Sequence, residues 1–296
     1  METAPLPPAR PAAGGVRMLA GVPCGSLPGA RPLELDLWLP PASTTLHPLV
    51  IFFHGGGWRL GSRHTIGPAY AGASPNPFEM VAQAGIAVAS VDYRLSGEAV
   101  FPAQLHDANA AVRWLRARAT ELGVDPDRIA AWGESAGGHL AELLGLAGAA
   151  LDGEVGATGP ATHVSAVVAW YGPSDLAAVA TDAHADPLDE TTREAMLLGA
   201  PAVSVPELAA QASPLNHVHG GAPPFLLLHG RADRFISHRQ SERLHAALAA
   251  RDVDVSLHLY DDADHMWLGS PPAAIDALRR TIDFLGQHLR APLPAN

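Results

Sequence analysis

The chain has 296 residues, of which 48% are hydrophobic, and it has a formal net charge of −11 and no lysine. This length and apolar content are sufficient for one large α/β domain, so a second domain is not required. The acidic balance, without any basic run, argues against nucleic acid and anionic membrane surfaces as partners. The single cysteine, Cys24, excludes an internal disulfide and a cysteine-rich metal site.

Residues 1–15 are rich in proline and alanine and show no helical periodicity, so we expect a flexible tail followed by one domain over 16–296. The first residues contain neither a positive segment nor an apolar run of the kind found in signal peptides. No stretch approaches the roughly 18 apolar residues that a membrane-spanning helix needs. These absences predict a cytoplasmic protein that does not insert into a membrane.

Segments typical of strands and helices alternate along the domain. We expect strands near residues 16–20, 33–39, 48–53, 86–91, 128–132, 164–170, 224–229 and 255–260. We expect helices near residues 75–84, 103–122, 136–149, 238–251 and 272–289. This alternation predicts an α/β fold with an eight-stranded, mostly parallel sheet that is covered by helices on both faces.

A glycine-rich turn follows the apolar strand at 48–53, where residues 54–58 have the sequence His-Gly-Gly-Gly-Trp. Consecutive glycines allow backbone N–H groups to converge on one point, as the stabilisation of an oxyanion requires. A phosphate-binding loop is disfavoured, because no Gly-Lys-Ser/Thr follows. A plain linker is the alternative. We therefore expect Gly56 and Gly57 to contribute N–H groups to an oxyanion hole.

The strand at 128–132 leads into Gly-Glu-Ser-Ala-Gly at 133–137, and a helix-prone run follows. This pattern alone is weak in a chain with 29 glycines, but its position between a strand and a helix is typical of a nucleophile elbow. Glycines are needed two positions either side of Ser135, because a Cβ there would collide with neighbouring backbone. Ser135 is thus the expected nucleophile. The N–H of Ala136, the next residue, is expected to join the oxyanion hole.

A serine nucleophile needs a histidine to take its proton and a carboxylate to orient that histidine. Asp233 follows the strand at 224–229, and His265 follows the strand at 255–260. The chain order Ser135, Asp233, His265, with each residue just after a strand, is the order found in α/β hydrolases.

Several residues compete for the two supporting roles. Asp175 is the alternative acid, because it follows the strand at 164–170. Three further histidines, His54, His139 and His229, lie beside the same expected rim. For His54 and His139 we favour a role in backbone or helix packing. The acidic residues close to His265, which are Asp261, Asp262 and Asp264, are expected to remain solvated.

With these motifs the chain resembles a known family. The matching runs are His-Gly-Gly-Gly-Trp, Gly-Glu-Ser-Ala-Gly-Gly-His, Asp92-Tyr93-Arg94-Leu95, Phe101-Pro102-Ala103-Gln104 and Trp114-Leu115. They are similar to those of α/β hydrolases related to hormone-sensitive lipase, and most of all to small bacterial esterases near carbohydrate esterases, feruloyl esterases and arylformamidases. The similarity covers roughly residues 30–290. Lipase-like members of this family carry a helical N-terminal cap, whereas residues 1–15 of this chain show no helical periodicity. A closed, capped acyl pocket is therefore not expected.

The segment 173–223 interrupts the alternation with prolines, acidic residues and short helical patches. We expect it to be a lid or pocket wall; a plain connector is the alternative. His217 and His219 lack nearby carboxylate or cysteine partners, so neither a metal nor a cofactor is expected. The side chains that flank the expected catalytic positions, and could form pocket walls or ordinary packing, are those of Trp58, Phe235, Met266 and Trp267.

Together the motifs and the resemblance imply a serine carboxylesterase that hydrolyses short-chain acyl esters of small molecules. An arylformamidase or other amidase with the same triad is one alternative. A non-catalytic binding protein with a hydrolase fold is another. The sequence does not determine the oligomeric state or the physiological substrate.

Overall fold

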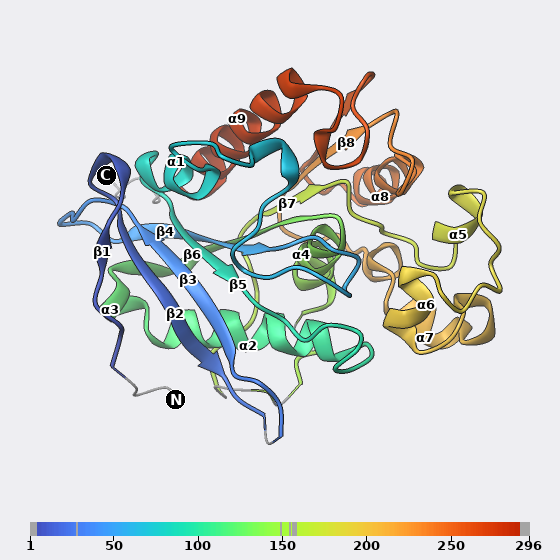
Figure 1. The fold of residues 1–296 in the computed structure, drawn as a ribbon, viewed down its shortest axis with the longest axis horizontal. Coiled ribbons are helices and arrows are strands. Elements are labelled where there is room, and N and C mark those ends of the chain that lie inside the picture. Colours follow the sequence, from blue (N-terminus) through green and yellow to red (C-terminus); the bar gives the residue numbers. More distant parts are fainter. Residues whose placement is uncertain (1–4, 28, 149, 154, 156–158, 291–296) are drawn as a thin grey trace.

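The computed structural model describes residues 5–27, 29–148, 150–153, 155 and 159–290 (Figure 1). The end of the helix expected at 136–149, the first four residues of the expected tail and the last six of the domain lie outside these residues. Within the described part, one sheet has the strand order β1-β2-β3-β5-β4-β6-β7-β8-β9. Its strands are β1 (Arg10–Pro11), β2 (Arg17–Gly25), β3 (Leu33–Leu39), β4 (His47–Phe53), β5 (Ala87–Val91), β6 (Val124–Glu134), β7 (Val167–Trp170), β8 (Phe225–Gly230) and β9 (Val255–Tyr260).

The sheet is mostly parallel, as expected. Strand β4 pairs in parallel with β5 and β6, and parallel pairs continue through β7 and β8 to β9. Strands β1, β2 and β3 pair antiparallel at the other edge. The expected count of eight strands is wrong, because the described residues form nine. Arg10 and Pro11, which the sequence places in the tail, pair with Met18 and Arg17.

Helices cover both faces of the sheet (Figure 1). They are α1 (Pro77–Gln83), α2 (Ala103–Ala117), α3 (Ala119–Leu122), α4 (Ala136–Ala147), α5 (Val179–Asp182), α6 (Arg193–Leu198), α7 (Pro206–Gln211), α8 (Arg239–Ala249) and α9 (Pro271–His288). The helix expected at 103–122 is divided at Arg118 into α2 and α3. Among the described residues, no helix combines the length and the apolar content that crossing a bilayer requires.

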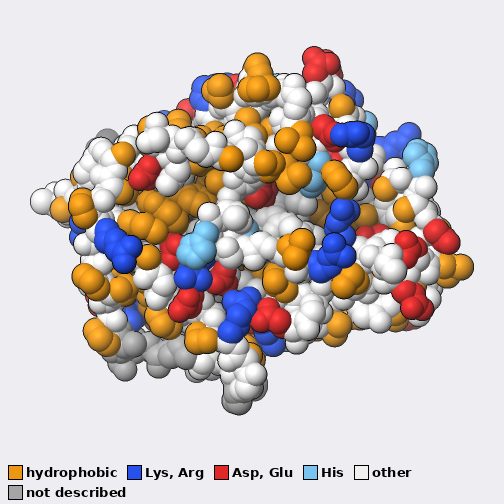
Figure 2. All heavy atoms as spheres, in the orientation of Figure 1, with side chains coloured by type: hydrophobic (Ala, Val, Ile, Leu, Met, Phe, Trp, Pro, Cys, Tyr) orange, Lys and Arg blue, Asp and Glu red, His pale blue; other side chains and the backbone are white. Residues whose placement is uncertain are grey.

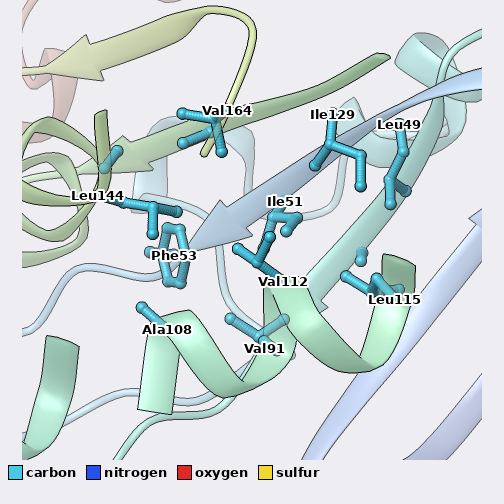
Figure 3. Packing of buried hydrophobic residues seen from close by; sticks show 14 of the residues in the cluster. Leu49, Ile51, Phe53, Val91, Ala108, Val112, Leu115, Ile129, Leu144 and Val164 are labelled. Atoms are coloured by element: carbon cyan, nitrogen blue, oxygen red, sulfur yellow. The ribbon is translucent and has the colours of Figure 1, made fainter. Parts of the chain in front are cut away.

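Strand β4 shows why a central strand is a continuous apolar run. Its alternate residues Leu49, Ile51 and Phe53 pack in one buried cluster with side chains of α2, α3, α4 and α8. The intervening Val50 and Phe52 belong to a second cluster with side chains of α1 and α9. Figure 3 shows Ile51 and Phe53 beside Val112 of α2 and Leu144 of α4. Both faces of the strand are therefore buried, as parallel sheets require.

The segment 173–223 contains α5, α6 and α7, which lie together at one end of the sheet in Figure 1. A third apolar cluster joins this segment to the rest of the domain. In this cluster Leu197 and Leu198 of α6 pack with Trp58 and Ala136. The backbone N–H of Phe101 also donates to the carbonyl of Leu197 at 2.8 Å. The segment is thus anchored beside the glycine turn and the start of α4.

Candidate active site

Ser135 occupies the sharp turn between β6 and α4. Its φ of 52° and ψ of −119° are unusual for a residue with a side chain, and its N–H donates to the carbonyl of Trp170 at 2.8 Å. A Cβ at Gly133 would overlap the backbone of Gly137, and a Cβ at Gly137 would overlap the carbonyl of Phe53. The steric requirement for both glycines is confirmed. The turn is a strained elbow that exposes the Ser135 hydroxyl above the sheet.

The three residues expected to form a triad lie in one hydrogen-bonded line. The Oγ of Ser135 is 3.0 Å from Nε2 of His265. The Nδ1 of His265 is 2.6 Å from Oδ2 of Asp233. Because Asp233 follows β8 and His265 follows β9, the parallel sheet brings both to the edge at which the Ser135 elbow lies. A histidine held in this way can remove the hydroxyl proton.

Asp233 is held by more than the histidine of the triad. Its Oδ1 accepts the N–H groups of Phe235 at 2.9 Å and Ile236 at 2.8 Å. Nε2 of the buried His229 lies 3.3 Å from Oδ2 of Asp233. Burial acts to raise the pKa of Asp233, but the interactions with His229 and His265 outweigh it and hold this pKa well below its usual range. Asp233 is therefore an anion at neutral pH.

The competing residues have other partners. The carboxylate of Asp175 lies 3.5 Å from Nε of Arg243. His54 contacts the carbonyl of Gly55 through Nδ1 at 2.7 Å and stacks on Tyr93. In His139, Nδ1 accepts from Nε1 of Trp58 at 3.2 Å, and Nε2 lies 2.7 Å from the carbonyl of Ala212.

Burial lowers the pKa of His54 and of His139 to about 4, so both rings are neutral near pH 7. The contacts of both rings with backbone carbonyls and neighbouring aromatic rings agree with the packing roles expected for them. The expectation that Asp264 is solvated is wrong. Its carboxylate accepts from Nε of Arg234 at 2.6 Å and from the N–H of His265 at 2.7 Å. This pairing braces the loop that presents His265.

The glycine turn and the elbow place three N–H groups near Ser135. Gly56 and Gly57 have φ values of 116° and 60°, which favour glycine. Ala136 is the first residue of α4, where N–H groups have no partner within the helix. The N–H groups of Gly56, Gly57 and Ala136 donate no hydrogen bond to any of the described residues. The three groups are available to an oxygen that develops negative charge.

Glu134, which the sequence reasoning missed, supports the glycine turn. Its carboxylate accepts the N–H of Gly67 at 2.9 Å and, more weakly, that of Gly55 at 3.4 Å. The hydroxyl of Tyr171 donates to the same carboxylate at 2.9 Å. Burial raises the pKa of Glu134. The available signal was its place between Gly133 and Ser135 in the elbow motif.

A cavity of about 1080 Å³ opens above Ser135 and His265. One wall comes from the N-terminal half and includes Trp38, Tyr70 and Phe78, and the other comes from residues 179–194. In the view of Figure 2, hydrophobic side chains gather in the hollowed middle of the molecular face. The insertion 173–223 therefore contributes directly to the wall of this cavity.

The four residues that flank the expected catalytic positions differ in whether they line the cavity. Trp58, Phe235 and Met266 line the cavity. The expectation for Trp267 is wrong, because its side chain is 1% exposed and packs in the core against Trp170 and Tyr171, with ring centroids 5.6 Å and 4.8 Å away. The Trp267 ring is thus enclosed in the aromatic core, whereas Met266 contributes to the cavity wall.

The sheet order, the elbow and the line of Ser135, His265 and Asp233 together define an α/β-hydrolase fold. The chain belongs to the BD-FAE family, whose family model matches residues 35–248. This confirms the resemblance to esterases related to hormone-sensitive lipase.

Curated relatives carry esterase names. The chain is 33% identical over 266 residues to Esterase LipQ of Mycobacterium tuberculosis, a match that covers 88% of this chain and 60% of that protein. It is 36% identical over 220 residues to Esterase LipC of the same organism, covering 72% and 52% of the two chains. The chain thus spans between about half and 60% of the length of these relatives. A solved structure of a truncated carbohydrate esterase from gut microbiota superposes with a TM-score of 0.80 and 28% identity, covering 94% of this chain and 99% of that one.

Proposed function

We propose that this chain is a carboxylic ester hydrolase in which Ser135 is the nucleophile. The observation behind this proposal is the hydrogen-bonded line from Ser135 Oγ through His265 to Asp233, with distances of 3.0 Å and 2.6 Å. The esterase names of its relatives support the same reaction class.

Acylation begins when Ser135 Oγ attacks the acyl carbon and Nε2 of His265 takes the hydroxyl proton. The carbonyl oxygen then becomes an anion, which the N–H groups of Gly56, Gly57 and Ala136 stabilise. As the tetrahedral intermediate collapses, the bond to the alcohol oxygen breaks and His265 returns its proton to that oxygen. Asp233, ionised throughout, stabilises the transient imidazolium.

Deacylation repeats these steps with water. His265 takes a proton from the water molecule, whose oxygen attacks the acyl carbon of the acyl-enzyme. The bond to Ser135 Oγ breaks, the carboxylic acid is released and the proton returns to Ser135. The chemistry is complete without a cofactor.

The substrates that fit this proposal are short acyl esters with a bulky alcohol group. Among the described residues, no α-helix precedes β2, and the segment 173–223 forms a wall with polar and small residues rather than a tunnel of long apolar helices. A cavity of about 1080 Å³ exceeds what an acetyl or butyryl group fills, which leaves room for a sugar or aromatic alcohol.

An amidase of the arylformamidase type would use the same triad, and faster hydrolysis of N-formylkynurenine than of aryl esters would favour it. A non-catalytic role in binding would be expected if one member of the triad were replaced, but Ser135, Asp233 and His265 are all present and aligned.

The test is Ser135→Ala, assayed with p-nitrophenyl butyrate. The variant should fold normally, as judged by its circular dichroism and melting temperature, and lose on the order of 10⁴- to 10⁶-fold in turnover. An organophosphate should label Ser135 of the parent chain stoichiometrically. Turnover retained by the variant, or an adduct on another residue, would refute the assignment.

A further inference from the structure

Arg193 lies across the top of the candidate active site. It is the first residue of α6, and its side chain extends over the glycine turn, so that a Cβ added to Gly57 would lie 2.5 Å from its Cδ. Its guanidinium then stacks on the ring of Phe235, 4.8 Å from the centroid. The Phe235 ring is in turn 5.5 Å from the ring of His265. One side chain thus connects the oxyanion turn with the catalytic histidine.

The contacts of α6 hold Arg193 in place. The side chain of Thr192 caps α6 by accepting the N–H of Ala195 at 3.2 Å. Leu197 and Leu198 of the same helix are buried in the apolar cluster that contains Trp58. The positive charge is therefore carried by an anchored element, which lowers the entropy lost when a ligand binds.

Among the described residues, no ion pair joins Arg193 to Glu194 or to any other acid. Three other carboxylates of the cavity wall are engaged elsewhere: Asp36 with Arg63, Glu134 with Gly67 and Tyr171, and Asp189 with Thr191. Stacking occupies the flat face of a guanidinium and leaves its N–H edge available for a carboxylate.

The side of the site on which Arg193 lies indicates which part of the substrate it would contact. In the proposed ester hydrolysis, His265 delivers its proton to the leaving oxygen, so the alcohol lies on the side of this histidine. The ring of Phe235 lies beside the ring of His265, and the guanidinium of Arg193 stacks on the ring of Phe235. Building on the proposed function, we propose that Arg193 recognises a carboxylate on the alcohol part of the ester.

The experiment compares two acetate esters that differ only in charge, 3-carboxyphenyl acetate and 3-carbamoylphenyl acetate. Arg193→Met keeps an apolar side chain over Gly57 but removes the charge. It should lower kcat/KM about tenfold for the anionic ester, the effect of losing one charge-assisted contact, and less than about twofold for the neutral ester. Arg193→Lys should retain part of the preference. In the parent chain, the ratio of kcat/KM for the anionic ester to kcat/KM for the neutral ester should decrease as salt is added.

Arg59→Gln is the matched control, because Arg59 lines the same cavity and its guanidinium contacts Met196 Sδ at 3.6 Å rather than Phe235. It should change the ratio of the two esters less than about twofold. An equal loss of kcat/KM for the anionic ester in Arg193→Met and Arg59→Gln would indicate a general charge effect and overturn the role of Arg193. So would an unchanged ratio in Arg193→Met.

A third substrate, phenyl hemisuccinate, places the carboxylate on the acyl part instead. Loss confined to this ester in Arg193→Met would overturn the assignment to the alcohol side. Failure of the parent chain to hydrolyse even the neutral ester would refute the proposed function itself. Hydrolysis of the neutral ester without any effect of Arg193→Met would refute only the present inference.

Discussion

Glu142 should make the stability of this protein fall as the pH rises from about 4.5 to about 8. It lies in α4, two turns after Ser135, and neither of its buried carboxyl oxygens has a hydrogen-bond partner among the described residues. Burial raises its pKa from 4.5 to about 8. Between these values the folded protein holds a proton that the unfolded chain has released, so stability decreases as pH rises through this window. At 1.36 kcal/mol per pKa unit, the loss approaches about 5 kcal/mol above pH 8.

Glu142→Gln keeps the shape of the side chain and removes its ionisation. In urea unfolding at pH 8.5, the free energy of unfolding should exceed that of the parent chain by about 3–5 kcal/mol. At pH 4.5, where the parent carboxyl is protonated in the folded state and about half protonated in the unfolded chain, the difference should be below about 1 kcal/mol. Glu207→Gln, at an exposed position on α7, is the control and should change little at either pH. Equal stability of Glu142→Gln and the parent chain at pH 8.5 would refute the reasoning.

Two further predictions concern catalysis. Asp233→Asn should leave the fold intact but lower turnover by roughly 10⁴, because an amide holds the histidine in the wrong tautomer. Asp175→Asn should have far less effect, since its carboxylate faces Arg243, and the reverse ranking in steady-state kinetics would reassign the acid. In a p-nitrophenyl ester series, kcat/KM should be highest between acetate and butyrate, because each further methylene gains only about 0.8 kcal/mol, and only where water is excluded. A maximum at decanoate or longer would contradict an open acyl site.

The local signals in the sequence determined most of the site. An apolar run followed by glycines defines a strand that ends in a turn, and this pattern located both the oxyanion turn and the elbow at Ser135. Parallel strands end at one edge of a sheet, so the residues after strands 224–229 and 255–260 had to approach Ser135. The chain order of Asp233 and His265 supports the roles that we propose for them. These inferences need only short segments and the general rules of α/β sheets.

Other features depended on contacts between residues far apart in the chain. Arg10 and Pro11 form a strand only because β2 offers its edge, and no apolar alternation marks so short a segment. Trp267 is withdrawn from the cavity because its ring packs against Trp170 and Tyr171, which are distant in the chain. The position of Arg193 above Gly57 results from the packing of α6. A side chain in an irregular insertion follows no periodic pattern, so the sequence does not reveal which distant residue it contacts. Only the packing of the tertiary structure brings such segments together.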